Sequence, residues 1–444
     1  MKNITIKKGL KLPDRSRYET QNIEDIFPKT VGLISDDYNF FKGKPLIEIG
    51  SKINFDTFIL YNRKNEKFKL NLPVNGVLKD IVRGEKRKIL STKIEVLDST
   101  SNFYYENANG DNIQTIIEAL LSTGLYSAIR QRPFDTPVDF ETLPEVLFIN
   151  AMQTRPFSYS ANYILPFIKD DFITGVKTLS KLASKKVYVC VDKDFSIPMN
   201  EDEKVEIVKF SGPHPAGLTG THIHCLFPVN ERRKVWYIDF QEVGAIGKLF
   251  SKKVLTSLRY VTVSDLVNET VKIIRSPIGS NIYELLNIKK DKDTRIISGN
   301  VLFGRTVTED EPYLGRFDYQ ITIINEMTQR KFMEWALPGK DIFSVKNVFL
   351  SKIFKDKYVK FDTSMHGSIR PIVPVGSYER VFPFDIEITH LLRYLSIKDS
   401  EMALRLGVLE LSEEDLSLLT FVCPGKNDYT KMLKEVLEEI YFEF

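Results

Sequence analysis

The residues FSGPHPAGLTGTHIH (210–224) form the most constrained part of this 444-residue chain. They contain three glycines, two prolines and three of the chain's five histidines. Such dense Gly and Pro predict a shaped loop from Gly212 to Gly220, through which no helix or long strand runs. Thr221 to His224 then alternates, so a strand at this point would place His222 and His224 on one face.

The three histidines of this run allow two interpretations. His222 and His224 could bind a metal ion if a third ligand, such as His214, lay near them. Alternatively, they are hydrogen-bonding histidines of a loop and a strand end. No Cys/His spacing typical of a metal site accompanies them. We therefore expect neither a metal site nor a catalytic residue in this chain.

Predicted strands and helices alternate before this run. EVLFINA (145–151), KVYVCVD (186–192) and EIVKFSG (206–212) are typical of buried strands, and a helix is expected near residues 163–183. The alternation indicates a parallel sheet, and we expect a Rossmann-like α/β domain over residues 106–257. Ligands of such sheets lie at the carboxyl ends of the strands, which is where residues 210–224 are expected.

A nucleotide fingerprint is missing from this domain. The run Gly244–Lys248 only imitates a phosphate loop, because Glu242 stands at the place of the required earlier glycine and Leu249 replaces the Ser/Thr. No G-x-G-x-x-G motif follows a predicted strand. We therefore expect no self-sufficient NAD, flavin or ATP site.

Residues 1–105 read as short strands and turns. Their order of strand, hairpin, P-x-x-G turn (Pro73 to Gly76) and return strand resembles a biotinyl/lipoyl-like sandwich. The hairpin tip reads Asn62-Arg63-Lys64-Asn65 and lacks the motif that surrounds a carrier lysine. This resemblance implies the fold without a covalent prosthetic group.

Three further segments complete the predicted order. Residues 258–330 resemble a β-grasp (soluble-ligand-binding) domain, and residues 331–374 are a connecting segment. Residues 375–444 are predicted to be helical, with a helix start at Ser412 and a stop at Gly407. Three glycines of the β-grasp segment are expected at turns or close approaches rather than in catalysis: Gly279, Gly299 and Gly304.

The helical domain resembles a ferredoxin module that has no clusters. Ferredoxin-type proteins carry C-x2-C-x2-C-x3-C-P runs, because four thiolates must converge on one cluster. Two runs here end in Pro with that spacing but keep one cysteine, Cys423, which we expect to be a buried thiol. Chance is the rival explanation. The remaining positions are Glu413, Leu416 and Leu419 in one run, and Ile372, Val375, Tyr378 and Phe382 in the other.

Composition narrows the class of protein. The net charge of +3 and the absence of a basic stripe argue against nucleic acid as a partner. The three cysteines are too far apart in sequence for a disulfide framework, which fits a reducing cytosolic setting. We expect no signal peptide, because the N-terminus lacks an apolar core, and no apolar run approaches the ~20 residues of a membrane span.

Several strings together resemble one family, the A subunits of the bacterial sodium-translocating NADH:quinone oxidoreductases. The resemblance runs from Lys7 to about Ile440, and the family is similar to the C subunit of the Rnf complex and to the NADH-binding subunit of respiratory complex I. The strings are RGEKR (83–87), RQRPF (130–134), GPHPAGLTGTHIH (212–224), AIGKLF (245–250), RIISGNVLFG (295–304), YLGRF (313–317), PVGSYERVFPFDI (374–386) and TFVCPGK (420–426).

The resemblance implies a peripheral subunit on the cytoplasmic face of the bacterial inner membrane. The complex as a whole passes electrons from NADH through FAD, iron-sulfur centres, FMN and riboflavin to ubiquinone and exports Na+. The resemblance further implies that this subunit has no covalent cofactor, acts near the quinone site, and is not catalytic alone. Its implied partners are the other five subunits, chiefly the membrane-embedded B subunit, together with ubiquinone.

Four residues are candidate quinone contacts: Arg130, Arg132, Phe134 and His214. A quinone needs an apolar slot with a hydrogen-bond donor for its carbonyls, and Phe134 beside these side chains offers that chemistry. The alternative is a structural turn with an interdomain salt bridge, in a scaffold that docks on the membrane subunits and never contacts quinone. A third reading, a free lipoyl-type or metal-dependent cytosolic enzyme, lacks the carrier motif and the metal-ligand spacing.

Overall fold

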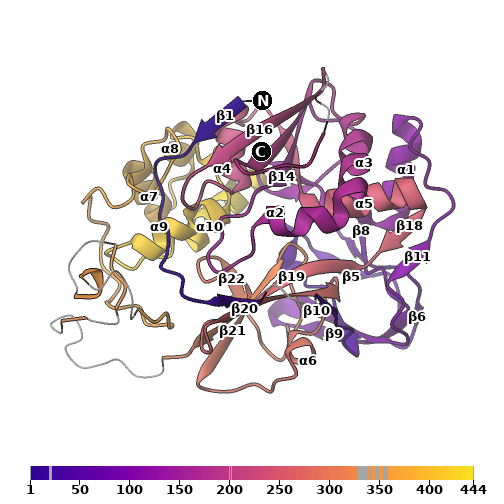
Figure 1. The fold of residues 1–444 in the computed structure, drawn as a ribbon, viewed down its shortest axis with the longest axis horizontal. Coiled ribbons are helices and arrows are strands. Elements are labelled where there is room, and N and C mark those ends of the chain that lie inside the picture. The colour runs from indigo at the N-terminus through magenta and orange to yellow at the C-terminus, as the bar shows by residue number, and fades with distance from the viewer. Residues whose placement is uncertain are drawn as a thin grey trace.

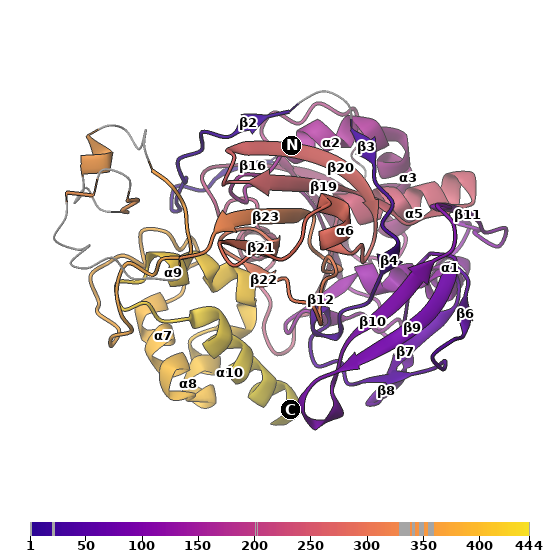
Figure 2. The same cartoon turned by 90° about the horizontal axis from the view of Figure 1, so that it is seen from below.

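The computed structural model describes residues 2–443 apart from 20–22, 200, 202, 328–337, 340–341, 346–349 and 354–358. Much of the expected connecting segment therefore lies outside the described residues. The chain forms an N-terminal set of short strands, a central α/β layer, a third mixed sheet and a C-terminal group of helices (Figure 1). The C-terminal helices (residues 388–443) and the strands of residues 52–96 lie on opposite sides of the third sheet (Figure 2).

The α/β layer is a seven-stranded sheet in the order β1-β16-β15-β14-β17-β12-β13. The three predicted strands are confirmed, and they pair in parallel with one another and with β17. All of β14 is buried, as expected for a strand covered on both faces. The strands are β1 (Lys2–Thr5), β12 (Arg130–Arg132), β13 (Thr136–Pro137), β14 (Val146–Ala151), β15 (Lys186–Asp192), β16 (Val205–Ser211) and β17 (Val235–Asp239).

Helices cover both faces of this sheet. Successive side chains of a strand point to opposite faces, and the apolar ones on each face pack against helices. Leu147 and Ile149 pack into the core shared with α3 and α5, whereas Phe148 joins the cluster that includes Ile223 of α4. The helices α3 and α5 touch through glycines: a Cβ on Gly247 would lie 1.7 Å from the carbonyl oxygen of Asp171. The helices are α1 (Ile113–Thr123), α2 (Ala161–Ile164), α3 (Lys169–Ser180), α4 (Thr219–Leu226) and α5 (Phe240–Lys252).

The expected strand at Thr221–His224 is wrong, because these residues lie in helix α4, which begins at Thr219. The amide of His222 donates to the carbonyl of Leu218 at 3.2 Å, so the shaped loop ends before Gly220. Four alternating residues are too few to distinguish a period of two from a helical period. His222 and His224 therefore do not share the face of a strand.

The first sandwich consists of a four-stranded sheet, β4-β10-β9-β6, and a three-stranded sheet, β5-β7-β8. Its hairpin tip is confirmed, with Asn62 of β7 opposite Asn65 of β8. Three N-terminal strands lie outside the expected sandwich: β1 pairs with β16, and β2 (Arg17–Tyr18) and β3 (Glu24–Asp25) pair with β20 (Thr270–Pro277). The sandwich strands are β4 (Thr30–Val31), β5 (Gly43–Pro45), β6 (Lys52–Ile53), β7 (Phe58–Asn62), β8 (Asn65–Asn71), β9 (Gly76–Arg83) and β10 (Ile89–Val96).

A two-stranded link of β11 (Asn102–Tyr104) and β18 (Val254–Thr256) leads to the third sheet, whose order is β2-β20-β19-β23-β21-β22. The expected turn at Pro277 and Gly279 and the short helix after it are confirmed. Gly279 and Gly299 have φ values of 71° and 111°, which favour glycine. The elements are β19 (Leu258–Asp265), β20 (Thr270–Pro277), α6 (Ile282–Leu286), β21 (Thr294–Gly299), β22 (Gly304–Thr306) and β23 (Gln320–Asn325).

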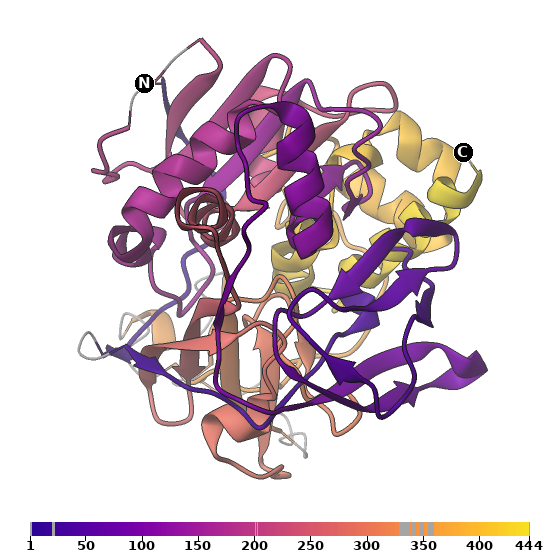
Figure 3. The ribbon, with the colours of Figure 1, turned by 90° about the vertical axis from the view of Figure 1, so that its right-hand side faces the viewer.

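The C-terminal helices have a hydrophobic core of their own. The predicted capping residues are confirmed: Ser412 forms a capping box with Asp415, and Gly407 adopts a left-handed conformation after α8. The end of α10 lies beside the strands of the first sandwich (Figure 3), where the Lys64 ammonium is 3.5 Å from the centre of the Phe442 ring. The helices are α7 (Ile388–Ile397), α8 (Ser400–Arg405), α9 (Ser417–Val422) and α10 (Tyr429–Glu443).

Candidate functional site

The Gly/Pro loop follows β16 at the carboxyl edge of the parallel sheet, as expected, and the N-terminal segment covers it. A Cβ on Gly212 would lie 2.2 Å from the carbonyl oxygen of Ile6, so the close approach requires glycine. The amide of Leu10 donates to the carbonyl of His214 at 2.8 Å. The loop is therefore held by an N-terminal segment that is far from it in sequence.

Two of the three histidines are buried and neutral. Burial lowers the pKa of His214 to about 4 and that of His222 to about 3. His214 Nδ1 lies 3.3 Å from Thr154 Oγ1, and its buried Nε2 has no hydrogen-bond partner among the described residues. His222 Nε2 donates to the carbonyl of Ala216 at 2.9 Å. These side chains pack the loop and are not available as acids near neutral pH.

The third histidine connects α4 to the C-terminal helices. The amide of Asp385 donates to His224 Nε2 at 3.0 Å, so Nδ1 carries the proton and donates to Glu410 at 2.7 Å. The imidazole also stacks on Phe384, with ring centres 4.6 Å apart. Among the described residues, no group of three His, Cys, Asp or Glu side chains could hold a metal ion.

Arg132 is 2% exposed and is held by acceptors within the chain. It lies 2.5 Å from Asp135 and donates to Ser412 Oγ at 2.7 Å, to Asp415 at 3.1 Å and to the carbonyl of Glu410 at 3.0 Å. Burial opposes its charge, but the two carboxylates outweigh burial and raise the pKa of Arg132 above its usual value. Arg132 thus forms an ion pair with the C-terminal part of the chain, as the alternative of a structural turn with an interdomain salt bridge predicts.

A second arginine pairs with the same acidic turn. Arg155 donates to both carboxylate oxygens of Glu414, at 2.5 and 2.7 Å. The neighbouring carboxylate of Asp415 lies against the start of α4, where a Cβ on Gly220 would be 2.2 Å from Asp415 Oδ1. The start of a helix favours an anion, and here the chain's own carboxylates fill the edge of the sheet where a ligand of such a fold would lie.

Arg130 and Phe134 lie against aromatic rings. The Arg130 guanidinium stands 4.1 Å from the ring centre of Phe317 and 4.7 Å from that of Tyr237. Phe134 is half-buried and packs on Tyr441, with ring centres 5.4 Å apart. The structure therefore places Arg132 and His214 in a polar junction, and Arg130 and Phe134 among aromatic rings.

The Phe134 ring belongs to an aromatic cluster at the junction of three parts of the chain. Phe40 comes from the first sandwich, and its ring centre is 6.4 Å from Phe134 and 4.2 Å from Tyr441. The side-chain amide of Asn39 donates to the carbonyl of Phe134 at 2.9 Å and fixes the turn. We call Phe40, Phe134, Tyr441 and Phe442 the aromatic cluster.

The structure also contains a buried group of charged side chains around Glu242, which the sequence analysis did not predict. Glu242 accepts paired hydrogen bonds from Arg259 and Arg316, at 2.7–2.9 Å. Burial alone would raise the pKa of Glu242, but the two guanidinium groups lower it well below its usual value. Burial raises the pKa of Asp239, at the end of β17, to about 7. The signal in the sequence was Glu242, the single acidic residue of the segment 240–252.

The two cysteine-depleted runs of the C-terminal domain come together. Tyr378 of one run contacts Cys423 of the other, with its hydroxyl 3.2 Å from the sulfur. Tyr429 Oη lies 3.3 Å from the same sulfur. Cys423 is fully buried, as expected, and although burial raises its pKa, the tyrosine hydroxyls lower it below the usual value.

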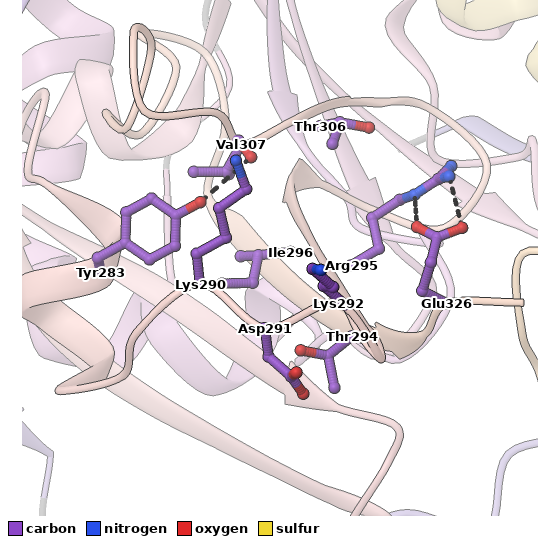
Figure 4. Close-up of a pocket in the computed structure, with 10 residues that line it drawn as sticks. All are labelled: Tyr283, Lys290, Asp291, Lys292, Thr294, Arg295, Ile296, Thr306, Val307 and Glu326. Carbon is purple, nitrogen blue, oxygen red and sulfur yellow. Dashed lines mark hydrogen bonds and ion pairs between the residues drawn. The ribbon is translucent and has the colours of Figure 1, made fainter. Parts of the chain in front are cut away.

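A pocket of about 160 Å³ lies in the third sheet, lined by Tyr283, Lys290 and Arg295 among others (Figure 4). Arg295 donates to both oxygens of Glu326, at 2.6 and 2.8 Å, so this positive charge is neutralised within the pocket. None of the four candidate quinone contacts lines it. Among the described helices, none is long and apolar enough to cross a membrane.

Comparison with known proteins decides the family. Two family models match, the NqrA N-terminal barrel-sandwich hybrid domain over residues 4–97 and the NqrA second alpha/beta domain over residues 112–255. The A subunit of the Na+-translocating NADH-quinone reductase of Vibrio parahaemolyticus is 37% identical over 442 residues, which is 98% of this chain and 99% of the relative. The chain belongs to this family.

Other relatives agree with this assignment to the NqrA family. The A subunit of the Hahella chejuensis reductase is 38% identical over 98% of this chain and 99% of its own length. The expected N-terminal sandwich is confirmed as the family's barrel-sandwich hybrid domain. An NAD+-reducing [NiFe]-hydrogenase in the H2-reduced state is 10% identical, with a TM-score of 0.36 over 49% of this chain and 48% of that chain, which is too low to support an argument.

Proposed function

We propose that the chain is the peripheral A subunit of a Na+-translocating NADH:ubiquinone reductase, which couples electron transfer from NADH to ubiquinone to the export of Na+. The supporting observation is the similarity to relatives of that name, at 37–38% identity over 98% of this chain. The chain works only in assembly. Bacterial membranes that lack their own A subunit should regain NADH-driven ubiquinone reduction and Na+ transport when the chain is supplied, and no recovery would contradict the proposal.

The partners and cofactors follow from this placement. The chain binds the other five subunits, chiefly the membrane-embedded B subunit, at the cytoplasmic face of the inner membrane, and carries no covalent cofactor itself. FAD, FMN, riboflavin and iron-sulfur centres belong to the rest of the complex. The geometry of the hairpin tip supports this division, because Lys64 is engaged by the Phe442 ring at 3.5 Å instead of projecting freely as a carrier lysine does.

The finer fold relationships are part of the same proposal. The parallel strands β14 to β17 follow the spatial order 3-2-1-4, which supports a Rossmann-like domain. In the third sheet a hairpin, a short helix and β23 parallel to β19 support a β-grasp domain. The contact between Tyr378 and Cys423 supports a ferredoxin-like module without clusters, since it joins the two runs.

We further propose that ubiquinone contacts the chain at the aromatic cluster, with Phe134 against its ring and Arg130 as the donor to a carbonyl. Phe134 is half-buried and shares its surroundings with Tyr441, which is 38% exposed, so an apolar ring can reach this place. Aromatic walls with a few polar groups are typical of small-molecule sites. The other two candidates are buried: Arg132 donates to Ser412 Oγ, and His214 Nδ1 lies beside Thr154 Oγ1.

A photoreactive ubiquinone analogue tests this placement in the assembled complex. The label is expected within residues 130–136, and the Phe134→Ala variant should lose most of it. Phe167→Ala is the matched control, because Phe167 is 56% exposed and lies outside the aromatic cluster. Labelling that avoids residues 130–136 and 212–224 would contradict the quinone contact and leave the family assignment intact.

A second candidate function is a docking scaffold that never contacts quinone. Two observations favour it: Arg132 is held by several acceptors within the chain, and the His214 side chain is buried. Titration of the purified chain with a short-chain ubiquinone separates the two functions. Saturable binding that Phe134→Ala abolishes supports quinone contact, whereas no binding together with normal assembly supports the scaffold.

A further inference from the structure

Two carboxylates face each other across the seam between the first sandwich and the third sheet. Asp37 ends the short 3-10 turn Ser35–Asp37 that follows β4, and Asp318 lies between β22 and β23. A Cβ on Gly315 would lie 2.4 Å from Asp318 Oδ2 and 3.2 Å from Asp37 Oδ1. Both oxygens therefore approach one point, and they are no further apart than the sum of those two distances.

Neutral donors hold each carboxylate in place. The amide of Arg316 donates to Asp37 Oδ2 at 2.7 Å. The hydroxyl of Ser298 donates to Asp318 Oδ2 at 2.6 Å. These donors fix the two side chains across the seam without supplying a positive charge.

The cations that face the pair are bound to other acceptors. Arg305 donates to the carbonyls of Glu311 and Tyr313, at 2.7 and 2.6 Å. Arg155 donates to both oxygens of Glu414. Two neighbouring carboxylates without a cation of their own favour one shared proton over two negative charges. The charged groups that face the pair are Asp36, Arg155, Arg305 and Glu414.

The proton affinity of the pair agrees with this geometry. Burial, and after it the charge of Asp318, raises the pKa of Asp37 to about 7, and burial raises the pKa of Asp318 as well. Both side chains are half-buried, so protons reach them from solvent. The closed seam thus holds a proton that the open seam releases. The proton stabilises the closed seam at low pH, and this stabilisation is lost as pH rises from about 4 to about 7.

The seam borders the aromatic cluster. Tyr38 packs on Phe317, with ring centres 5.6 Å apart. The side-chain amide of Asn39 donates to the carbonyl of Phe134 at 2.9 Å. Tyr38 and Asn39 directly follow Asp37 in the chain, so they move with it when the seam opens.

We propose that Asp37 and Asp318 share one proton in the closed seam, and that release of this proton to solvent loosens the seam and, through Asn39, the turn of Phe134. The seam is then a pH-sensitive switch within the fold. The proton passes to water, and no electron moves. The inference does not depend on quinone contact or on assembly of the complex, because the isolated chain contains every group that takes part.

Hydrogen exchange of the full-length chain tests the proposal. The amide of Arg316 and its neighbours report opening of the seam, once their exchange rates are divided by the intrinsic chemical rates at each pH. The opening equilibrium constant should rise about tenfold from pH 6 to pH 8, as a pKa of about 7 in place of the usual 3.8 requires. Amides of α7–α10 should not show this rise. An equal rise there would report opening of the whole chain and overturn the proposal.

Neutral variants assign the effect to the pair. The rise should vanish in Asp37→Asn and become smaller in Asp318→Asn, which leaves Asp37 without a facing carboxylate. Asp56→Asn, at an exposed position of the first sandwich, is the matched control and should keep the rise. Variants are needed because burial also raises the pKa of Asp239 to about 7. A wild-type seam that opens equally at pH 6 and pH 8, or a full rise in either pair variant, overturns the proposal.

Discussion

The C-terminal helices meet the rest of the chain at two places of opposite chemistry. At the polar junction, Arg132 and Arg155 are held by carboxylates of residues 414 and 415. At the aromatic cluster, Tyr441 and Phe442 lie against Phe40 and Phe134 and remain about 40% exposed. The first contact is buried at Arg132 and half-buried at Arg155, and it pairs each guanidinium with a carboxylate, so removing one partner leaves the other charge unpaired. The second can lose a ring and let water enter, which makes it the adaptable contact.

The largest expected effect comes from removing Arg132. Arg132→Ala leaves Asp135 and Asp415 without their cation in a buried place, and breaking such a pair costs about 3–5 kcal/mol. Urea unfolding of the isolated chain measures the loss. Arg405→Ala is the control, because Arg405 forms an exposed pair with Glu401 and such pairs contribute less than about 1 kcal/mol. Equal losses in the two variants would show that the junction does not stabilise the fold.

A smaller loss is expected when Gly220 gains a methyl group. Its Cβ would lie 2.2 Å from Asp415 Oδ1, so Gly220→Ala must displace the acidic turn at a cost of about 2 kcal/mol. Gly110→Ala is the control, since its Cβ would meet nothing closer than 3.4 Å. The double variant Gly220→Ala, Asp415→Gly should lose less than the sum of the two single losses, because the obstructing carboxylate is gone. Strict additivity would contradict this contact.

The strands of the α/β sheet and the residues of the candidate site differ in how far the sequence alone could predict them. The strands of 145–151, 186–192 and 206–212 were predictable because apolar runs of that length leave few alternatives. Arg132 and His214 were chosen as candidate contacts because they stand in restricted backbone, and their contact with quinone stays a prediction. The partners of Arg132 in residues 410–415 lie some 280 positions away, and no local pattern encodes a pairing across that distance. The helix at Thr219 was missed for a related reason, because four residues carry too little periodicity.

The histidines of the loop predict how stability depends on pH. The pKa of His222 is lowered to about 3, so the unfolded chain binds more protons than the folded chain between that pH and the usual value of 6.5. Stability should therefore fall as pH falls through this window, by about 2 kcal/mol from this residue at pH 5. His222→Gln should flatten the profile measured by urea unfolding, whereas His390→Gln, at an exposed position, should not. An unchanged slope in His222→Gln would assign the effect to other groups.

The smallest effect is expected at the aromatic cluster. Tyr441 stacks on Phe40 at 4.2 Å but is 38% exposed, so Tyr441→Ala should cost only about 1 kcal/mol. Tyr104→Ala, at a residue that is 66% exposed, should change stability by about 0.5 kcal/mol or less. If ubiquinone binds against Phe134, Tyr441→Ala should raise the Kd of a short-chain ubiquinone by more than this stability change alone suggests, because the same ring would then line the slot. A normal Kd with the expected stability loss would assign the cluster to packing, and the scaffold would become the better description of the chain.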